Sequence, residues 1–188
     1  MRYRGFNLTA VWLLIGINLV LFIATLINKD LILFLGLQPA SLLDRPWTLV
    51  TNLFIHGGIW HILANMITLF FFGSFLCRLV GVRNFLITYF CGGILGNILY
   101  LLLALSPYSI VIGASGAIYA VAGALAVMVP NLRVLLYFIV PMPLWVVILV
   151  FFVLWSFIPG VAWQAHIGGL VFGLIMGFFF RRRMRYYF

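Results

Sequence analysis

The stretch VIGASGAIYAVAG, residues 111–123, places Ser115 between glycines at the start of a run of small apolar residues. From Ser115 to the residue before Pro130 the run has about 15 residues, which an α-helix would extend over roughly 22 Å. The hydrocarbon core of a bilayer is about 30 Å thick. The stretch therefore predicts a short helix whose N-terminal end, with Ser115, lies below the membrane surface.

The composition requires a lipid environment. Hydrophobic residues make up 66% of the 188 residues and charged residues only 7%, which is too little polar surface for a water-soluble globule. Lipid offers no hydrogen-bond partners, so the backbone must pair with itself in helices or in a closed barrel. The apolar runs show no period-two alternation, which favours helices over a barrel. We predict an all-α fold, a polytopic membrane helical bundle of six transmembrane helices forming a single domain over residues 1–188. The expected segments are 10–27, 61–80, 84–105, 115–129, 134–155 and 165–180.

The basic residues predict the orientation. Arginines precede the first segment, flank the connection between the second and third, and follow the sixth, and Arg133 lies between the fourth and fifth. Six crossings place all of these on one side, which the positive-inside rule identifies as the cytoplasm. The net charge of +9 is thus explained by topology, and no nucleic-acid partner is expected. The half-apolar first outer loop, about residues 28–60, is expected to associate with the membrane face.

A histidine on the sixth segment is a candidate partner for Ser115. In WQAHIGGLVFG, residues 163–173, His166 shares a helical face with a row of glycines at Gly169, Gly173 and Gly177. The face of the fourth segment that carries Ser115 also carries Tyr119, Ala122 and Ala126. Rows of small residues let membrane helices approach closely, so we expect His166 beside Ser115. The alternatives are a serine that only caps its helix and a histidine that only bonds a loop carbonyl.

The stretch HGGIWHILANM, residues 56–66, supplies further polar groups. His61 and Asn65 lie four residues apart on one helical face, and His56 lies in the loop above them. An imidazole N–H and an amide NH₂ can both donate to an anion, as in an oxyanion hole. A zinc site is the alternative, but the spacing is not that of H-E-x-x-H, and the sequence has no Glu to act as a base. We therefore expect no metal and no cofactor.

The acidic residues decide between a dyad and a triad. Asp30 and Asp44 are the only acidic side chains, and both lie in the first outer loop next to Lys29 or Arg45. A catalytic triad needs a buried carboxylate against the second ring nitrogen of its histidine. The sequence thus predicts a serine–histidine dyad, with His166 oriented by packing instead of by an acid.

These motifs, in this order and over essentially the whole chain, resemble the rhomboid intramembrane serine proteases. The resemblance rests on H-x-x-x-x-H-x-x-x-N from His56 to Asn65, G-x-S-G from Gly113 to Gly116, and a histidine followed by glycines at His166. It implies Ser115 as nucleophile, His166 as general base and acid, and an oxyanion hole formed by His61, Asn65 and the Ser115 amide. The residues expected to support this site are Gly113, Gly116, Tyr119 and His56.

The resemblance also implies a function and a location. It implies an endopeptidase that cleaves the transmembrane segments of single-span membrane proteins. It further implies a bacterial inner membrane or archaeal plasma membrane, with the active site opening to the extracytoplasmic side. The first outer loop departs from the family, which often has Trp-Arg there, because Trp47 is followed by Thr48 and preceded by Arg45. Trp155, near the outer end of the fifth segment, is a candidate substrate gate or an interfacial anchor.

Two other classes of protein remain as alternatives. One is a catalytically inactive rhomboid-like protein that binds membrane clients. The other is a small transporter or channel, which glycines, histidines and a broken segment would suit. The transporter is disfavoured because no acidic residue lies in any predicted spanning segment to couple protons or bind cations.

Overall fold

The computed structural model describes residues 8–136, 140–156, 158 and 160–184, and most of them are helical. The helices are α1 (Thr9–Ile27), α2 (Asp30–Leu35), α3 (Thr48–Thr51), α4 (Ile59–Thr68), α5 (Ser74–Leu103), α6 (Ser115–Met128), α7 (Leu144–Ser156) and α8 (Trp163–Met184). Short 3₁₀ turns η1 (Pro39–Ser41) and η2 (Asn52–Phe54) lie in the first loop, and a π-helical turn η3 (Leu69–Gly73) joins α4 to α5. Strands β1 (Arg133–Leu136) and β2 (Val140–Pro143) form an antiparallel hairpin.

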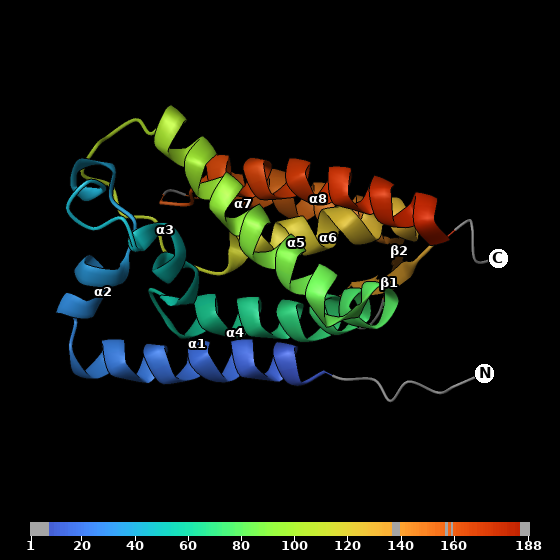
Figure 1. The fold of residues 1–188 in the computed structure, drawn as a ribbon, viewed down its shortest axis with the longest axis horizontal. Coiled ribbons are helices and arrows are strands. Elements are labelled where there is room, and N and C mark those ends of the chain that lie inside the picture. Colours follow the sequence, from blue (N-terminus) through green and yellow to red (C-terminus); the bar gives the residue numbers. More distant parts are fainter. Residues whose placement is uncertain (1–7, 137–139, 157, 159, 185–188) are drawn as a thin grey trace.

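Three helical stretches in the described residues are long and apolar enough to cross a membrane: Thr9–Ile27, Ile59–Leu103 and Trp163–Arg182. The second has 45 residues and folds back on itself at Gly81, whose φ of 81° breaks the helix. Phe85, after the break, contacts Gly73 before it, so the stretch forms the two antiparallel limbs seen in Figure 1. These limbs correspond to the expected second and third segments. The chain is thus a mainly helical membrane protein.

The fifth segment differs from the sequence prediction. A helix was expected over residues 134–155, but α7 begins only at Leu144, and the residues before it form the β1–β2 hairpin. Pro141 and Pro143 explain the difference, because proline lacks the N–H that a helix interior needs and clashes with the preceding turn. The fifth helix therefore begins later than predicted, and α7 with 13 residues is short for a span. The predicted count of six spanning helices stays a prediction.

Helix α6 is the centre of the bundle. It has 14 residues, close to the short helix that the sequence predicts, and most of its side chains are buried. Helix α8 packs against it through glycines so closely that a Cβ on Gly169 would lie 2.0 Å from the Gly116 carbonyl oxygen. A Cβ on Gly173 would lie equally close to the Ala120 oxygen. In lipid such close packing is a main source of helix association.

The small-residue face of α6 is not the predicted one. Three α6 residues meet the α8 glycines, and they are Gly116, Ala120 and Ala124. The sequence prediction had placed Ala122 and Ala126 there. The predicted face began at Ser115, but the α8 backbone lies against the residue after it. Ser115 and Tyr119 consequently flank the contact, where their side chains can reach an α8 side chain.

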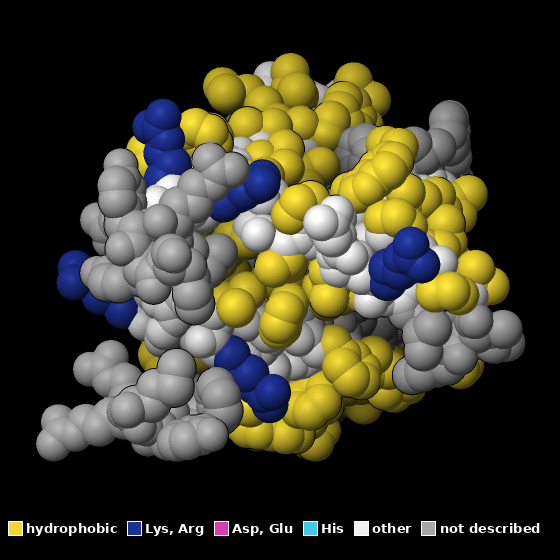
Figure 2. Space-filling model, turned by 90° about the vertical axis from the view of Figure 1, so that its right-hand side faces the viewer, with side chains coloured by type: hydrophobic (Ala, Val, Ile, Leu, Met, Phe, Trp, Pro, Cys, Tyr) yellow, Lys and Arg dark blue, Asp and Glu magenta, His cyan; other side chains and the backbone are white. Residues whose placement is uncertain are grey.

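Most of the described arginines lie at one end of the molecule. Helix α1 begins and α8 ends at the same end as the β1–β2 hairpin (Figure 1). Figure 2 shows that end, with several Lys or Arg side chains and no visible acidic side chain. Described arginines flank the break at Gly81 or lie in β1 and the last turns of α8: Arg78, Arg83, Arg133, Arg181 and Arg182. Helices α2 and α3 lie at the opposite end (Figure 1).

The first loop is held by side chains that cap the end of α2. The Arg45 guanidinium donates to the Leu33 carbonyl, the Trp47 indole N–H donates to the Phe34 carbonyl at 3.1 Å, and the Thr51 hydroxyl donates to the Leu35 carbonyl at 2.8 Å. Carbonyls in the last turn of a helix have no intrahelical partner, so these bonds replace the missing ones. The loop is therefore anchored although Thr48 stands where the family often has arginine. Its association with the membrane stays a prediction.

Candidate active site

Ser115 and His166 are brought together at the ends of α6 and α8. Ser115 is the first residue of α6, and His166 lies in the first turn of α8. The Ser115 Oγ is 2.8 Å from the His166 Nε2. The N-cap of α6 is Ala114, without a side-chain capping bond, so the serine side chain bonds the histidine instead of capping its helix.

The other ring nitrogen of His166 has no acidic partner. His166 is buried, and no hydrogen bond from its Nδ1 is found within the described part of the chain. Asp30 and Asp44 are both exposed. The Tyr119 ring stacks on the imidazole, with centroids 4.5 Å apart and planes inclined by 25°. The face of the Tyr119 ring thus lies against the His166 imidazole. Among the described residues, no carboxylate meets the Nδ1 edge, which an aspartate would contact in a triad.

Gly113 leaves a small space between Ser115 and His61. Its φ is 120°, a left-handed value that favours glycine. A Cβ at Gly113 would lie 2.7 Å from the His61 Nε2 and 3.8 Å from the Ser115 Oγ. His61 and Ser115 therefore border the same volume, which a side chain at residue 113 would fill. Gly116 faces α8, where a Cβ would lie 3.3 Å from the Ala165 oxygen.

His61 presents an N–H to that volume. The Gly57 amide donates to the His61 Nδ1 at 3.4 Å, a long hydrogen bond. A neutral imidazole that accepts at one nitrogen carries its proton on the other. We therefore assign the proton of His61 to Nε2, the nitrogen next to Gly113. This is the arrangement that a hydrogen-bond donor to an oxyanion needs.

His56 is buried behind the serine turn. Its Nε2 accepts a long hydrogen bond of 3.5 Å from the Ala114 amide, and its ring meets that of His61 edge to face at 4.9 Å. Burial, and to a smaller extent the neighbouring His61, lowers the pKa of His56 to about 3 against a smaller opposing effect of the Phe54 backbone. A neutral His56 therefore holds the amide of the residue before Ser115.

Asn65 and Trp155 are less closely tied to the serine. The Asn65 side-chain amide donates to the His61 carbonyl at 2.8 Å, one turn back on α4. No hydrogen bond joins it to Ser115 or His166 among the residues described. Trp155 lies in the last turn of α7, and its side chain falls outside the described part, so its role as a gate stays a prediction.

Asn52 and Asn97 were missed by the sequence reasoning. Their side-chain amides bond each other in the interior, between η2 and α5. The available signal was Asn97, an amide within the apolar segment 84–105. A polar side chain at membrane depth calls for a partner, but the sequence does not say which of several loop residues provides it.

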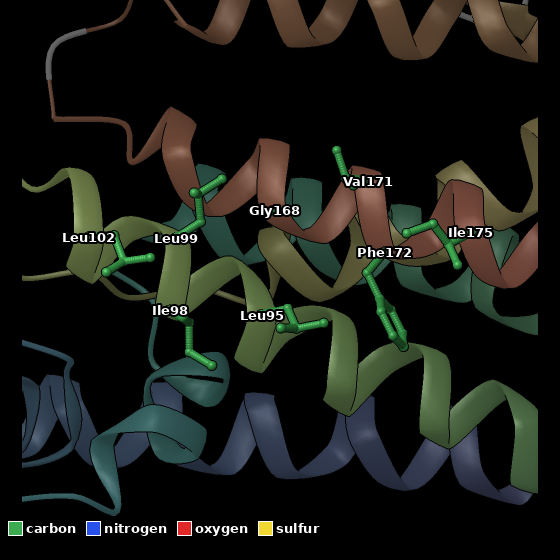
Figure 3. A pocket seen from close by; sticks show the side chains of 8 residues that line it. All are labelled: Leu95, Ile98, Leu99, Leu102, Gly168, Val171, Phe172 and Ile175. Atoms are coloured by element: carbon green, nitrogen blue, oxygen red, sulfur yellow. The ribbon is translucent and has the colours of Figure 1, made fainter.

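A groove lies between α5 and α8 and is lined by apolar side chains. Its volume is about 280 Å³, and Figure 3 shows the side chains that line it, which are leucines and Ile98 from α5 and Val171, Phe172 and Ile175 from α8. None of the site residues predicted from the sequence lines it, and it contains no ionisable group. It offers no chemistry of its own. Among the described residues, no three His, Cys, Asp or Glu side chains form a cluster that could hold a metal ion.

The fold and the site define a class: integral, multi-pass helical membrane proteins that pair a serine and a histidine at the ends of two adjoining helices. The model of the rhomboid domain matches residues 43–183. The chain therefore belongs to the rhomboid family.

Three relatives illustrate the similarity. The chain is 30% identical to the mitochondrial Rhomboid protein 1 of Saccharomyces cerevisiae, over 90% of this chain and 52% of the relative. It is 35% identical to the putative rhomboid protease YdcA of Bacillus subtilis, over 70% of this chain and 66% of the relative. The identity to the rhomboid protease GluP of the same organism is 28%, over 88% of this chain and 33% of the relative. The chain thus spans about half the length of the first relative and a third of the last.

Proposed function

We propose that this chain is an intramembrane serine endopeptidase that cleaves transmembrane segments of membrane proteins with a Ser115–His166 dyad. The observation that carries the proposal is the 2.8 Å contact between the Ser115 Oγ and the His166 Nε2. The name of the relative GluP, a rhomboid protease, supports the same reaction class.

The first half of the reaction forms an acyl-enzyme. The Ser115 Oγ attacks the carbonyl carbon of the scissile peptide while its proton passes to the His166 Nε2. The carbonyl oxygen becomes an oxyanion, which accepts hydrogen bonds from the Ser115 amide, the His61 Nε2–H and the Asn65 amide. The first amides of α6 have no intrahelical partner and lie at the positive end of the helix dipole. The C–N bond then breaks, and His166 gives its proton to the leaving nitrogen.

The second half consumes water. His166 takes a proton from a water molecule, whose oxygen attacks the acyl carbon, and the proton then returns to the Ser115 Oγ as the ester bond breaks. The Tyr119 ring face stabilises the transient imidazolium, because a cation over an aromatic ring is attracted to its quadrupole. This stacking takes the place that a carboxylate has in a triad.

The orientation follows from the charges. The end that carries the arginines is the cytoplasmic end, since positively charged loops stay on that side. Ser115 then lies toward the opposite face, and the site opens to the extracytoplasmic side of a bacterial inner or archaeal plasma membrane. A fusion of green fluorescent protein to the C-terminus should fluoresce, and a fusion of alkaline phosphatase at the same place should be inactive. The reverse pattern would overturn the orientation.

The preferred substrates are single-span segments that unwind easily near their outer end. A regular helix engages its carbonyls in its own hydrogen bonds, so a scissile carbonyl must first be released. Glycine or proline near the scissile bond lowers that cost by about 1–3 kcal/mol per residue. Replacing such residues by leucine in a reporter should slow cleavage by at least tenfold, whereas an unchanged rate would contradict this preference.

A fluorophosphonate probe separates the protease from the inactive client-binding alternative. The probe reacts only with an activated serine, so it should label Ser115 of the protein in liposomes, and mass spectrometry would locate the adduct. Ser74→Ala is the matched control, because Ser74 is a buried serine elsewhere in the bundle, and it should keep full labelling. Absence of label on Ser115 in the folded wild type would favour the inactive alternative.

A further inference from the structure

A pair of buried asparagines joins the first loop to α5. The Asn52 Nδ2 donates to the Asn97 Oδ1 at 3.0 Å, and the Asn97 Nδ2 donates back to the Asn52 Oδ1 at 2.8 Å. The Asn97 Nδ2 also donates to the Leu49 carbonyl at 2.8 Å. Both side chains are almost fully buried, with 0% and 2% exposed. The mechanism proposed above uses neither of them.

The pair fixes η2 firmly against α5. A buried amide without a partner is costly, so the closed arrangement in which each side chain serves the other resists displacement. Leu53, next to Asn52, packs on Gly93, where a Cβ would come within 2.8 Å of the leucine side chain. Gly93 and Asn97 lie one turn apart on α5 and thus receive successive residues of η2.

The segment from Asn52 to His56 holds both backbone amides that precede Ser115. The Gly113 amide donates to the Asn52 carbonyl at 2.9 Å, and the Ala114 amide donates to the His56 Nε2 at 3.5 Å. Gly113 is also the residue with a φ of 120° that borders His61. A shift of η2 would therefore turn the serine relative to both His61 and His166.

We infer that Asn52 and Asn97 are positioning residues for the nucleophile. The amide pair anchors η2 to α5, and η2 in turn fixes the backbone that presents Ser115 to His166. The inference rests on the proposed function of Ser115. It predicts that loss of the pair lowers the rate of acylation more than it lowers substrate binding, because the nucleophile is misaligned while the rest of the bundle stays in place.

The test uses Asn97→Leu in the full chain, in liposomes, with a single-span reporter and a fluorophosphonate probe. We expect kcat and the labelling rate of Ser115 to fall by about 10–100-fold with KM changed less than threefold, as for a small displacement of a reacting group. Asn97→Ser, whose hydroxyl is too short to serve both Asn52 and Leu49, is the second variant in case the leucine prevents folding. Asn52→Leu should have a similar effect, and the double variant should be little worse than either single one.

Asn18→Leu is the matched control. Asn18 is a fully buried asparagine on α1 that donates to the Leu14 carbonyl of its own helix, so its loss tests destabilisation without removing the hydrogen bonds between Asn97 and the first loop. At a temperature well below the thermal midpoints of the wild type and of Asn18→Leu, the Asn18 variant should keep the wild-type kcat. Equal losses in the Asn18 and Asn97 variants, or a wild-type labelling rate in Asn97→Ser, would overturn the inference. Failure of the wild type itself to label would instead contradict the proposed function.

Discussion

At the scale of single residues, three histidines near the serine turn differ in the hydrogen-bonding partners of their ring nitrogens. His56 accepts at Nε2 from a backbone amide, and His61 accepts at Nδ1. The Nε2 of His166 faces the Ser115 hydroxyl. In the neutral state each ring has one donor and one acceptor nitrogen. These contacts fit a structural role for His56, a donor role for His61 and the proposed role of base for His166.

Removing the proposed oxyanion donors tests this division. His61→Ala and Asn65→Ala should each lower kcat by roughly 10²–10³, the usual loss for one oxyanion donor. Neither should abolish cleavage, because the Ser115 amide remains. Thr68→Val, one turn further on α4, removes an exposed hydroxyl that bonds the Ala64 carbonyl of its own helix, and it should cleave like the wild type. Unchanged turnover in both the His61 and Asn65 variants would remove this cluster from the site.

At the scale of elements, the close contact between α6 and α8 sets the distance between serine and histidine. Three glycines of α8 face α6 so closely that no side chain fits: Gly169, Gly173 and Gly177. The contact begins one residue from Ser115 and three residues from His166. A change in helix separation therefore acts directly on the hydrogen bond between them.

Gly173→Ala should separate the two helices. Its methyl group would meet the Ala120 carbonyl oxygen at 2.0 Å, and such overpacking costs about 1–3 kcal/mol. We expect a lower thermal midpoint in detergent and a clear loss of turnover. Gly16→Ala on α1 is the control, since nothing lies within 4 Å of the added methyl group, and it should be neutral or slightly stabilising. Wild-type midpoint and turnover in Gly173→Ala would contradict the close contact.

The sequence predicted local features of these elements better than their contacts. The short helix at Ser115 and the glycine row on α8 follow from spacing alone. The face of α6 was predicted one residue off, because the choice depends on which side of the serine the α8 backbone passes. The hairpin before α7 was missed, since apolar content outweighed Pro141 and Pro143. The Asn52–Asn97 pair joins residues 45 apart in sequence, and no local pattern identifies such a partner.

At the scale of the whole molecule, charge is segregated from the site. The described arginines lie mostly at the end shown in Figure 2, and the aspartates are exposed in the loop at the other end. The interior around His166 holds no carboxylate in the described residues. This distribution keeps charges out of lipid and fits the proposed acid–base chemistry of a dyad without a carboxylate.

The double variant Asp30→Asn, Asp44→Asn tests whether a loop acid reaches the site. We expect turnover within about tenfold of the wild type, because a dyad needs no carboxylate, whereas loss of a triad carboxylate costs on the order of 10⁴. Circular dichroism and the thermal midpoint would verify folding. A loss of the larger size in a folded double variant would require the dyad to be withdrawn.

The most direct test of the central claim is cleavage of a single-span reporter by the purified protein in liposomes. Wild type, Ser115→Ala, His166→Ala and the control Ser74→Ala would be compared by the rate at which the cleaved fragment appears. The account predicts cleavage by the wild type and by Ser74→Ala. It predicts none above background by Ser115→Ala or His166→Ala, although both insert and fold. Cleavage at a near wild-type rate by either of these two variants would contradict the Ser115–His166 dyad.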